Sequence, residues 1–129
     1  MRILLDTQCW LWLQADPERL SERTLSLLAD PENEIFLSSA SAWEIAIKYA
    51  LGKLPLPTAP WQYVPTRMAL TGTTGLPVQM THALRVAKLP PHHRDPFDSL
   101  LVAQAQLEKM SLLTSDAQLS AYDVRLLAP

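Results

Sequence analysis

The sequence predicts an α/β fold: a three-layer α/β/α sandwich with a short, mainly parallel central sheet. Short apolar segments alternate with longer segments of helical periodicity, a pattern typical of strand–helix–strand units. The length of 129 residues suits one domain with one continuous core. No repeat, low-complexity tract or linker interrupts the sequence, so we expect a single domain over residues 1–129.

Five short apolar segments are the expected strands. The first is "RILL", whose branched residues suit a buried strand and which ends at Asp6. The second is "EIFLS", and the third, "GLPV", is the weakest of the five. In chain order the expected strands cover residues 2–5, 34–38, 75–78, 111–115 and 122–127.

Helices are expected between these strands. Residues 7–14 form a short one, and residues 21–30 form another, with Ser21 as N-cap. The clearest helix covers residues 41–53, where Gly52 can supply a left-handed C-terminal residue. The face of this helix expected to be apolar consists of Trp43, Ile47, Ala50 and Leu51.

Three further helices are expected in the second half of the chain. Residues 59–70 form one, and residues 81–89 form another, with Thr81 as N-cap. The helix over residues 96–110 is apolar on most of its circumference, so it should lie centrally in the fold.

Composition excludes several classes of protein. Apolar residues make up 48% and charged residues 19%, which is ordinary for a globular domain. The net charge of −2 argues against binding nucleic acid through a broad basic face. No apolar run is long enough to span a bilayer, and the first apolar run is too short for a signal peptide, so we expect a cytoplasmic protein. The single Cys9 is expected to be a small buried hydrophobic residue.

Four acidic residues fall where strands pass into helices, namely Asp6, Glu44, Asp98 and Asp116. Each has an ordinary structural explanation. Asp6 can cap a helix, and Glu44 completes an S-x-x-E capping box with Ser41. Asp98 suits the first turn of a helix that Asp95 caps, and Asp116 has a similar position.

Taken together, the four acids indicate a metal site. In a parallel sheet the passages from strand to helix meet at one edge, so the four carboxylates should lie close together and repel one another. A hard divalent cation relieves that repulsion, and oxygen ligands suit Mg²⁺ or Mn²⁺. Such an ion can activate water for hydrolysis of a phosphodiester.

The sequence resembles the PIN-domain family, specifically the VapC-type toxins of bacterial type II toxin–antitoxin pairs. The motifs that carry the resemblance are "LLDTQCWLW", "SSASAWEIAIKYALGKL", "LPPHHRDPFDSLLVAQAQ" and "LLTSDAQLSAYDVRLL". They occur in the family's order and spacing and cover essentially the whole chain. Two features depart from the family pattern: Gln8 replaces a frequent His, and "AQLSAYD" lacks a frequent Phe.

The resemblance implies a Mg²⁺- or Mn²⁺-dependent endoribonuclease that a cognate antitoxin inhibits. It places the catalytic, metal-binding carboxylates at Asp6, Glu44, Asp98 and Asp116. Asp95, Thr7, Thr114 and Ser115 are candidate supporting residues, although capping explains the hydroxyls equally well. The implied partners are an RNA substrate, the antitoxin and a second copy of the chain in a homodimer, with no membrane.

Other residues have weaker functional interpretations. Arg94 is a candidate for contacting substrate phosphates, whereas His92 and His93 are more simply explained as solvated loop residues. Trp10, Trp12 and Trp43 are expected in the core, with the alternative that Trp10 or Trp12 lines a groove for an antitoxin peptide.

Two alternative functions stay open from the sequence. The first is another metal-dependent phosphoesterase on a similar sheet; a dehalogenase-like phosphatase needs a second Asp where Gln8 stands. The second is a catalytically inactive PIN-fold binding module whose carboxylates only cap helices. The complete set of four acids argues against the inactive module.

Overall fold

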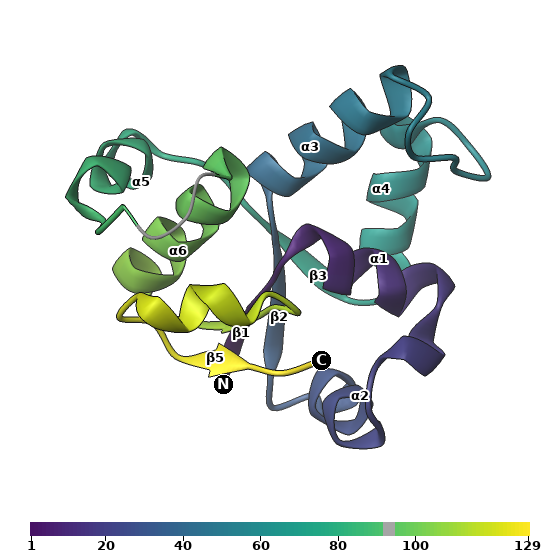
Figure 1. The fold of residues 1–129 in the computed structure, drawn as a ribbon. Helices are drawn as coiled ribbons and strands as arrows, with labels where there is room; N and C mark the ends of the chain where they lie inside the picture. The colour runs from purple at the N-terminus through teal and green to yellow at the C-terminus, as the bar shows by residue number, and fades with distance from the viewer. Residues whose placement is uncertain (92–94) are drawn as a thin grey trace.

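The computed structural model describes residues 1–91 and 95–129 and contains a five-stranded parallel sheet (Figure 1). The strands lie side by side in the order β3-β2-β1-β4-β5. Their bounds are β1 Arg2–Leu5, β2 Glu34–Ser38, β3 Thr73–Leu76, β4 Ser111–Leu113 and β5 Leu126–Leu127. The strand β1 is therefore central, with β2 and β3 on one side of it and β4 and β5 on the other.

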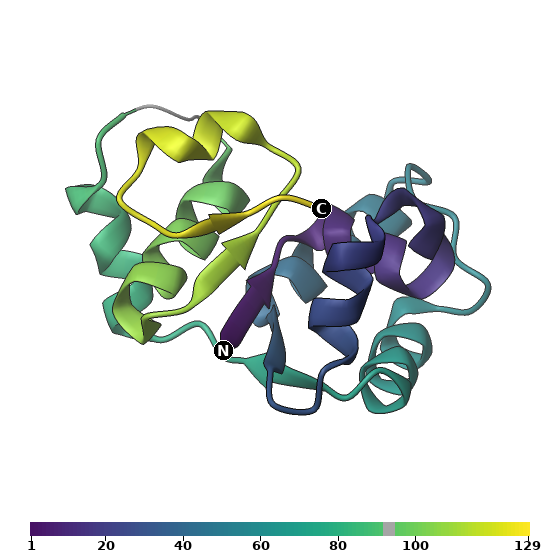
Figure 2. The same cartoon turned by 90° about the horizontal axis from the view of Figure 1, so that it is seen from below.

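Six α-helices connect the strands. They are α1 Thr7–Ala15, α2 Glu22–Ala29, α3 Ser39–Ala50, α4 Pro60–Leu70, α5 Met80–Arg85 and α6 Pro96–Glu108. Short 3₁₀ helices cover Pro17–Arg19, Val86–Lys88 and Ala117–Ala121. Figures 1 and 2 show α5 and α6 on one side of the sheet and α1, α2 and α4 on the other.

The sheet separates two hydrophobic cores, because alternate residues of each buried strand point to opposite faces. Ile3 and Leu5 of β1 pack with Trp10 of α1 and with Ile45 of α3 on one face. Leu4, between them in the sequence, packs on the other face with α6 and the C-terminal segment. Two helical layers on one sheet confirm the predicted three-layer α/β/α architecture.

The register brings the carboxyl ends of the central strands to one level. Leu5, the last residue of β1, is aligned with Leu37 of β2 and with Leu113 of β4. The residues that follow these three positions therefore emerge at the same edge of the sheet. This edge includes the point where the chain order reverses, between β1 and β4, which is the usual ligand site of open parallel sheets.

Several predicted boundaries are wrong. The third strand covers Thr73–Leu76 and not residues 75–78, and the last two strands are shorter than predicted. Residues 122–125, which were predicted to begin the last strand, lie outside any strand. The N-cap of α5 is Gln79 and not Thr81, because the Gln79 side chain and the His82 ring form a reciprocal capping box.

The predicted apolar face of α3 is also wrong. The helix begins earlier, at Ser39, and Ser38 is its N-cap, with Oγ accepting the Ala40 N–H at 3.0 Å. Glu44 is therefore beyond the first turn, and the predicted capping box with Ser41 does not form. Trp43, predicted in the core, is 62% exposed, and its ring contacts the edge of Phe97.

The buried face of α3 contains polar residues. A prediction that assigns the most apolar face of the helix to the core therefore selects the wrong face. Ala40, Ser41, Glu44 and Ile45 are buried, whereas Leu51 is exposed. Trp10 is fully buried and Trp12 is partly buried against the core, as predicted, and so is the free thiol Cys9. Gly52 has the predicted positive φ, 73°.

No helix among the described residues is long and apolar enough to cross a membrane. The predictions for His92, His93 and Arg94 fall outside the described residues.

Candidate active site

A pocket of about 310 Å³ lies at the carboxyl edge of the sheet. All four acids of the predicted site line it, together with Thr7, Asp95 and Ser115. The structure therefore brings the predicted carboxylates to one cavity from four segments that are distant in the sequence. The cavity holds five carboxylates and two lysines, which makes it strongly acidic in a chain of modest net charge.

Asp6 has the most constrained carboxylate of the pocket. It is only 7% exposed. Its Oδ1 accepts the Cys9 N–H at 2.7 Å and so caps α1, and its Oδ2 accepts the Thr114 hydroxyl at 2.7 Å. Each oxygen keeps a further lone pair, so Asp6 can cap the helix and still bind a ligand in the pocket.

Thr114 connects β4 to the pocket, although it is buried behind the lining. Its hydroxyl donates to Asp6 and accepts the Asp116 N–H at 3.0 Å. One hydroxyl group thus fixes the carboxylate after β1 relative to the backbone after β4. The two bonds make Thr114 a local cap for the backbone after β4 and also fix the orientation of Asp6.

Glu44 enters the pocket from the buried face of α3. Its side chain pairs with Lys48, one turn later, at 2.9 Å between Oε2 and Nζ. Lys48 is half-exposed, but Glu44 is only 9% exposed. This ion pair balances the charge of a buried carboxylate that lines the pocket beside the other acids.

Asp95 and Asp98 lie at the start of α6 and have different local roles. Asp95 is the N-cap, and its Oδ1 accepts the N–H groups of Phe97 at 2.9 Å and Asp98 at 3.4 Å. Pro96 occupies the first helical position, as predicted. Asp98 is half-buried in the first turn of the helix. The cap that fixes the start of the helix therefore also fixes the backbone position of Asp98.

Asp116 follows β4 and is partly exposed. Its Oδ1 accepts the Gln118 N–H at 2.9 Å and caps the short helix that follows. The structural explanation given to each acid at the sequence level therefore holds for Asp6, Asp95 and Asp116. It fails for Glu44, which caps nothing and pairs with Lys48 instead.

The pocket suits a hard divalent cation by its donor chemistry, since its acidic donors are all oxygen atoms. Thr7 Oγ1 and Ser41 Oγ are buried and have no hydrogen-bond partner among the described residues. No three His, Cys, Asp or Glu side chains in that part of the chain are already close enough to form a complete ligand set.

Burial and the neighbouring Asp6 carboxylate raise the pKa of the Cys9 thiol far above its ordinary range. The thiol therefore stays protonated at neutral pH and is neither a nucleophile nor a metal ligand there. This agrees with the structural role expected for Cys9.

Residues outside the predicted site complete the walls of the pocket. Lys48 and Lys53 line the pocket, as do Gln8, Leu11 and Leu54. The signal for Lys53 and Leu54 was Gly52, whose left-handed turn sends the chain back along α3; the Lys53 N–H bonds to the Lys48 carbonyl at 2.9 Å. The side of α3 that faces the pocket could not be chosen from hydrophobicity.

Comparison with known proteins finds a relative that is called a ribonuclease. Over 59 residues the chain is 52% identical to Ribonuclease VapC16 of Mycobacterium tuberculosis, a match that covers 46% of this chain and 42% of that protein. Thus the chain aligns with less than half the length of this relative.

Solved structures match over nearly the full chain. The VapBC2 structure from Rickettsia felis, bound to a DNA fragment from their promoter, has a TM-score of 0.74 at 17% identity, over 99% of this chain and 98% of that one. VapBC-1 from nontypeable Haemophilus influenzae has a TM-score of 0.66 at 19% identity, over 99% and 98%. At these identities the likeness shows a shared fold.

The model of the PIN domain family matches residues 3–125, which include β2, β3, β4, all of β1 but its first residue, and all four acids of the pocket. The chain belongs to the PIN domain family.

Proposed function

We propose that this protein is a Mg²⁺- or Mn²⁺-dependent endoribonuclease and the toxin of a type II toxin–antitoxin pair. The observation that carries the proposal is the acidic pocket, in which the carboxylates of Asp6, Glu44, Asp98 and Asp116 line one cavity of a PIN domain. The name of the 52% identical relative, Ribonuclease VapC16, supports RNA as the substrate. The solved VapBC structures support an antitoxin partner.

Asp6, Glu44 and Asp98 would hold the ion, directly or through waters, and Asp116 would complete the site or orient the attacking water. When bound, the ion would activate water and stabilise the charge of the transition state. Asp95 would keep Asp98 in place through the N-terminal cap of α6. Thr114 would keep Asp6 and Asp116 in register through its two hydrogen bonds.

Lys48 and Lys53 provide the positive charge that an RNA phosphate needs beside so many carboxylates. Lys48 is half-exposed and reaches Glu44 from the edge of the pocket. Its ammonium group partly neutralises Glu44 and is near enough to contact a phosphate at the pocket mouth. Thr7 and Ser115 are supporting residues on the pocket wall.

The test is cleavage of purified RNA with Mg²⁺ or Mn²⁺ by the wild type and by the Asp6→Asn and Asp98→Asn variants. Both substitutions remove a charge and keep the shape of the side chain, so we expect a loss of cleavage of at least about 100-fold with a cooperative unfolding transition retained. Asp30→Asn, on the surface outside the pocket, is the matched control and should cleave like the wild type. Metal-dependent cleavage retained by both pocket variants would disprove the assignment.

A further inference from the structure

A second and larger cleft, of about 510 Å³, lies at the opposite edge of the sheet from the candidate active site. It is formed at the amino ends of β1, β4 and β5, whereas the acidic pocket is at their carboxyl ends. Three cationic side chains line it, those of Arg2, Lys109 and Arg125, against the single carboxylate of Asp123. The charge of this cleft is therefore opposite in sign to that of the acidic pocket.

The three cations have no carboxylate partners. Among residues 1–91 and 95–129, the side-chain ion pairs are Lys48–Glu44 and His82–Glu108, and neither includes a cation of this cleft. Here the positive charges are left available to an anion from outside.

Arg2 is held in place in this cleft. Its Nη1 donates to the Glu108 backbone carbonyl at 2.7 Å, and its guanidinium carbon lies 5.4 Å from the centre of the Phe36 ring. A guanidinium has five N–H donors, so most remain for a ligand. The two contacts reduce the entropy lost when a ligand binds.

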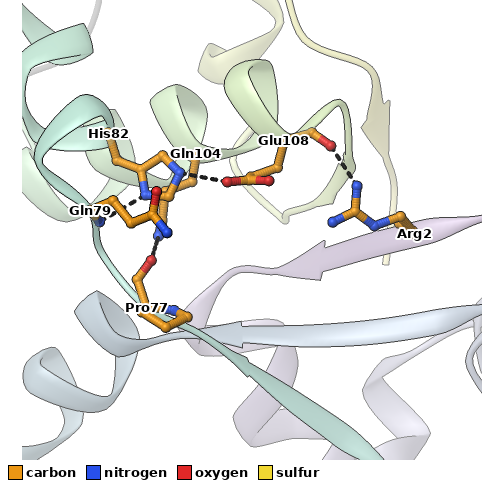
Figure 3. A network of polar contacts seen from close by, with 6 residues as sticks. All are labelled: Arg2, Pro77, Gln79, His82, Gln104 and Glu108. Carbon is orange, nitrogen blue, oxygen red and sulfur yellow. Dashed lines mark hydrogen bonds and ion pairs between the residues drawn. The ribbon is translucent and has the colours of Figure 1, made fainter.

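The Glu108 carboxylate would be the natural partner of Arg2, but buried His82 engages it instead (Figure 3). The His82 ring is 1% exposed, and its Nδ1 accepts the Gln79 backbone N–H at 3.0 Å. A nitrogen that accepts carries no proton, so in the neutral ring Nε2 carries it and donates to Glu108 Oε1 at 2.9 Å. Figure 3 shows this carboxylate directed to His82, with only the main-chain carbonyl of Glu108 toward Arg2.

The remaining walls of the cleft suit a sugar or base. Ala105, Met110 and Val124 supply apolar surface next to the cations. The Asp123 carboxylate has no hydrogen-bond or ion-pair partner among the described residues, and it can accept from a ribose hydroxyl or a base amine. The volume is in the range of small-ligand clefts.

We propose that this cleft binds a nucleotide unit, with its phosphate on Arg2, Lys109 and Arg125 and its ribose or base beside Asp123. Arginine forks match phosphate oxygens, and a lysine adds a point charge. A carboxylate-rich peptide would satisfy the cations but would meet Asp123 as a repulsive charge, so the nucleotide is favoured. The unit can be a free nucleotide or part of an RNA chain. The site does not depend on RNA cleavage at the acidic pocket.

The test is a titration of ¹⁵N-labelled protein in EDTA, followed by amide chemical shifts. The probes are adenosine monophosphate, the dinucleotide ApA without a terminal phosphate, adenosine, and a tri-glutamate peptide. Saturable shifts of the Arg2, Ser111 and Arg125 amides with the monophosphate indicate a free nucleotide, and shifts with ApA indicate an RNA chain. Either result supports the proposal.

The variant Lys109→Asn/Arg125→Gln removes two cations, and neither side chain makes a hydrogen bond or ion pair among the described residues. Asparagine also tolerates the left-handed backbone of position 109. We expect phosphate-dependent binding to weaken by about tenfold or more. Arg19→Gln/Lys88→Gln removes two cations elsewhere and should bind like the wild type.

Four results would overturn the proposal. These are equal shifts with adenosine, unchanged binding by the Lys109→Asn/Arg125→Gln variant, shifts confined to Asp6 and Glu44, and binding of tri-glutamate without binding of either phosphate probe. The last result would identify an acidic peptide as the ligand of the cleft.

Discussion

The hydrogen bond between Thr114 and Asp6 is the smallest unit that organises the candidate site. It joins the ends of two neighbouring strands through one hydroxyl, at 2.7 Å, between two buried side chains. Buried hydrogen bonds to charged groups stabilise by about 1.5–3 kcal/mol, which is enough to hold a carboxylate in one orientation. The same hydroxyl accepts the Asp116 N–H, so both acids depend on one side chain.

At Cys9, a neighbouring residue of Asp6 in space, the environment leads to a pH-dependent prediction. The pKa of the thiol is raised in the folded state, whereas in the unfolded chain it is about 8.5. Above that pH the unfolded chain loses the proton and the folded protein keeps it. The contribution of Cys9 to the free energy of unfolding should therefore be constant below about pH 8.5 and decrease above it.

The measurement is denaturant unfolding at about pH 7 and about pH 9.5, for the wild type and for Cys9→Ala. The wild type should lose more stability between the two pH values than the variant, which lacks the thiol. An equal loss in both proteins would show that Cys9 ionises alike in the folded and unfolded states.

At the scale of elements, the start of α6 couples stability to the site. Asp95→Ala removes the side-chain cap and should cost about 1 kcal/mol of the free energy of unfolding. Because the cap also holds the Asp98 N–H, RNA cleavage should fall by several-fold without being abolished. Denaturant unfolding and cleavage rates of the same preparation measure the two effects.

Ser21→Ala is the matched control for that prediction. Ser21 caps α2 by accepting the Thr24 N–H at 3.1 Å, and it does not line the acidic pocket. This variant should lose similar stability and keep its cleavage rate. If the two variants lose cleavage equally, the effect of Asp95 is one of general stability and not of position.

The ends of α3 and α6 provide a second pair of element-scale variants. Both helices end near a residue with positive φ: Gly52 at 73° and Lys109 at 56°. A side chain in this region costs about 1 kcal/mol, and a Cβ added at Gly52 would meet nothing within 4 Å.

We therefore expect Gly52→Ala to destabilise the protein, and Lys109→Gly to stabilise it, each by about 1 kcal/mol. Denaturant midpoints with unchanged slopes would report the two effects. A stabilising Gly52→Ala would contradict the assigned backbone conformation, since only the strain at positive φ distinguishes the two residues there.

At the scale of the whole molecule, the two ends of the sheet have opposite charge. The carboxyl ends of the strands converge on the acidic pocket, and their amino ends on the cleft that contains Arg2 and Arg125. The acidic pocket gathers five carboxylates against two lysines, so a cation should bind there. Mn²⁺ should therefore raise the melting temperature in proportion to the logarithm of its concentration above Kd, and EDTA should reverse the shift.

This whole-molecule prediction is measured by thermal melts with and without Mn²⁺. Asp6→Asn should reduce the shift strongly, and Asp123→Asn, at the opposite edge, should leave it unchanged. Identical shifts in all three proteins would mean that the ion binds elsewhere.

Patterns with a strict period predicted most of the architecture. The short apolar runs at residues 2–5 and 34–38 form the predicted strands, and their alternation with helices favours parallel crossovers. The Asp95–Pro96 pair similarly predicted where α6 begins, since capping depends on a few neighbouring residues. The lengths of the last two strands were not predictable, because strands this short depend on their neighbours in the sheet.

The sequence by itself determined the three-layer fold and the positions of the candidate carboxylates along the chain, because both follow from local periodicity and from the ends of strands. Only the tertiary structure decided that Glu44 is buried while Trp43 is exposed, because α3 turns a polar face to the pocket. The tertiary structure also decided that the Glu108 carboxylate binds His82, so that Arg2 contacts only the backbone carbonyl of Glu108. These outcomes depend on contacts between residues far apart in the sequence, which no local pattern contains.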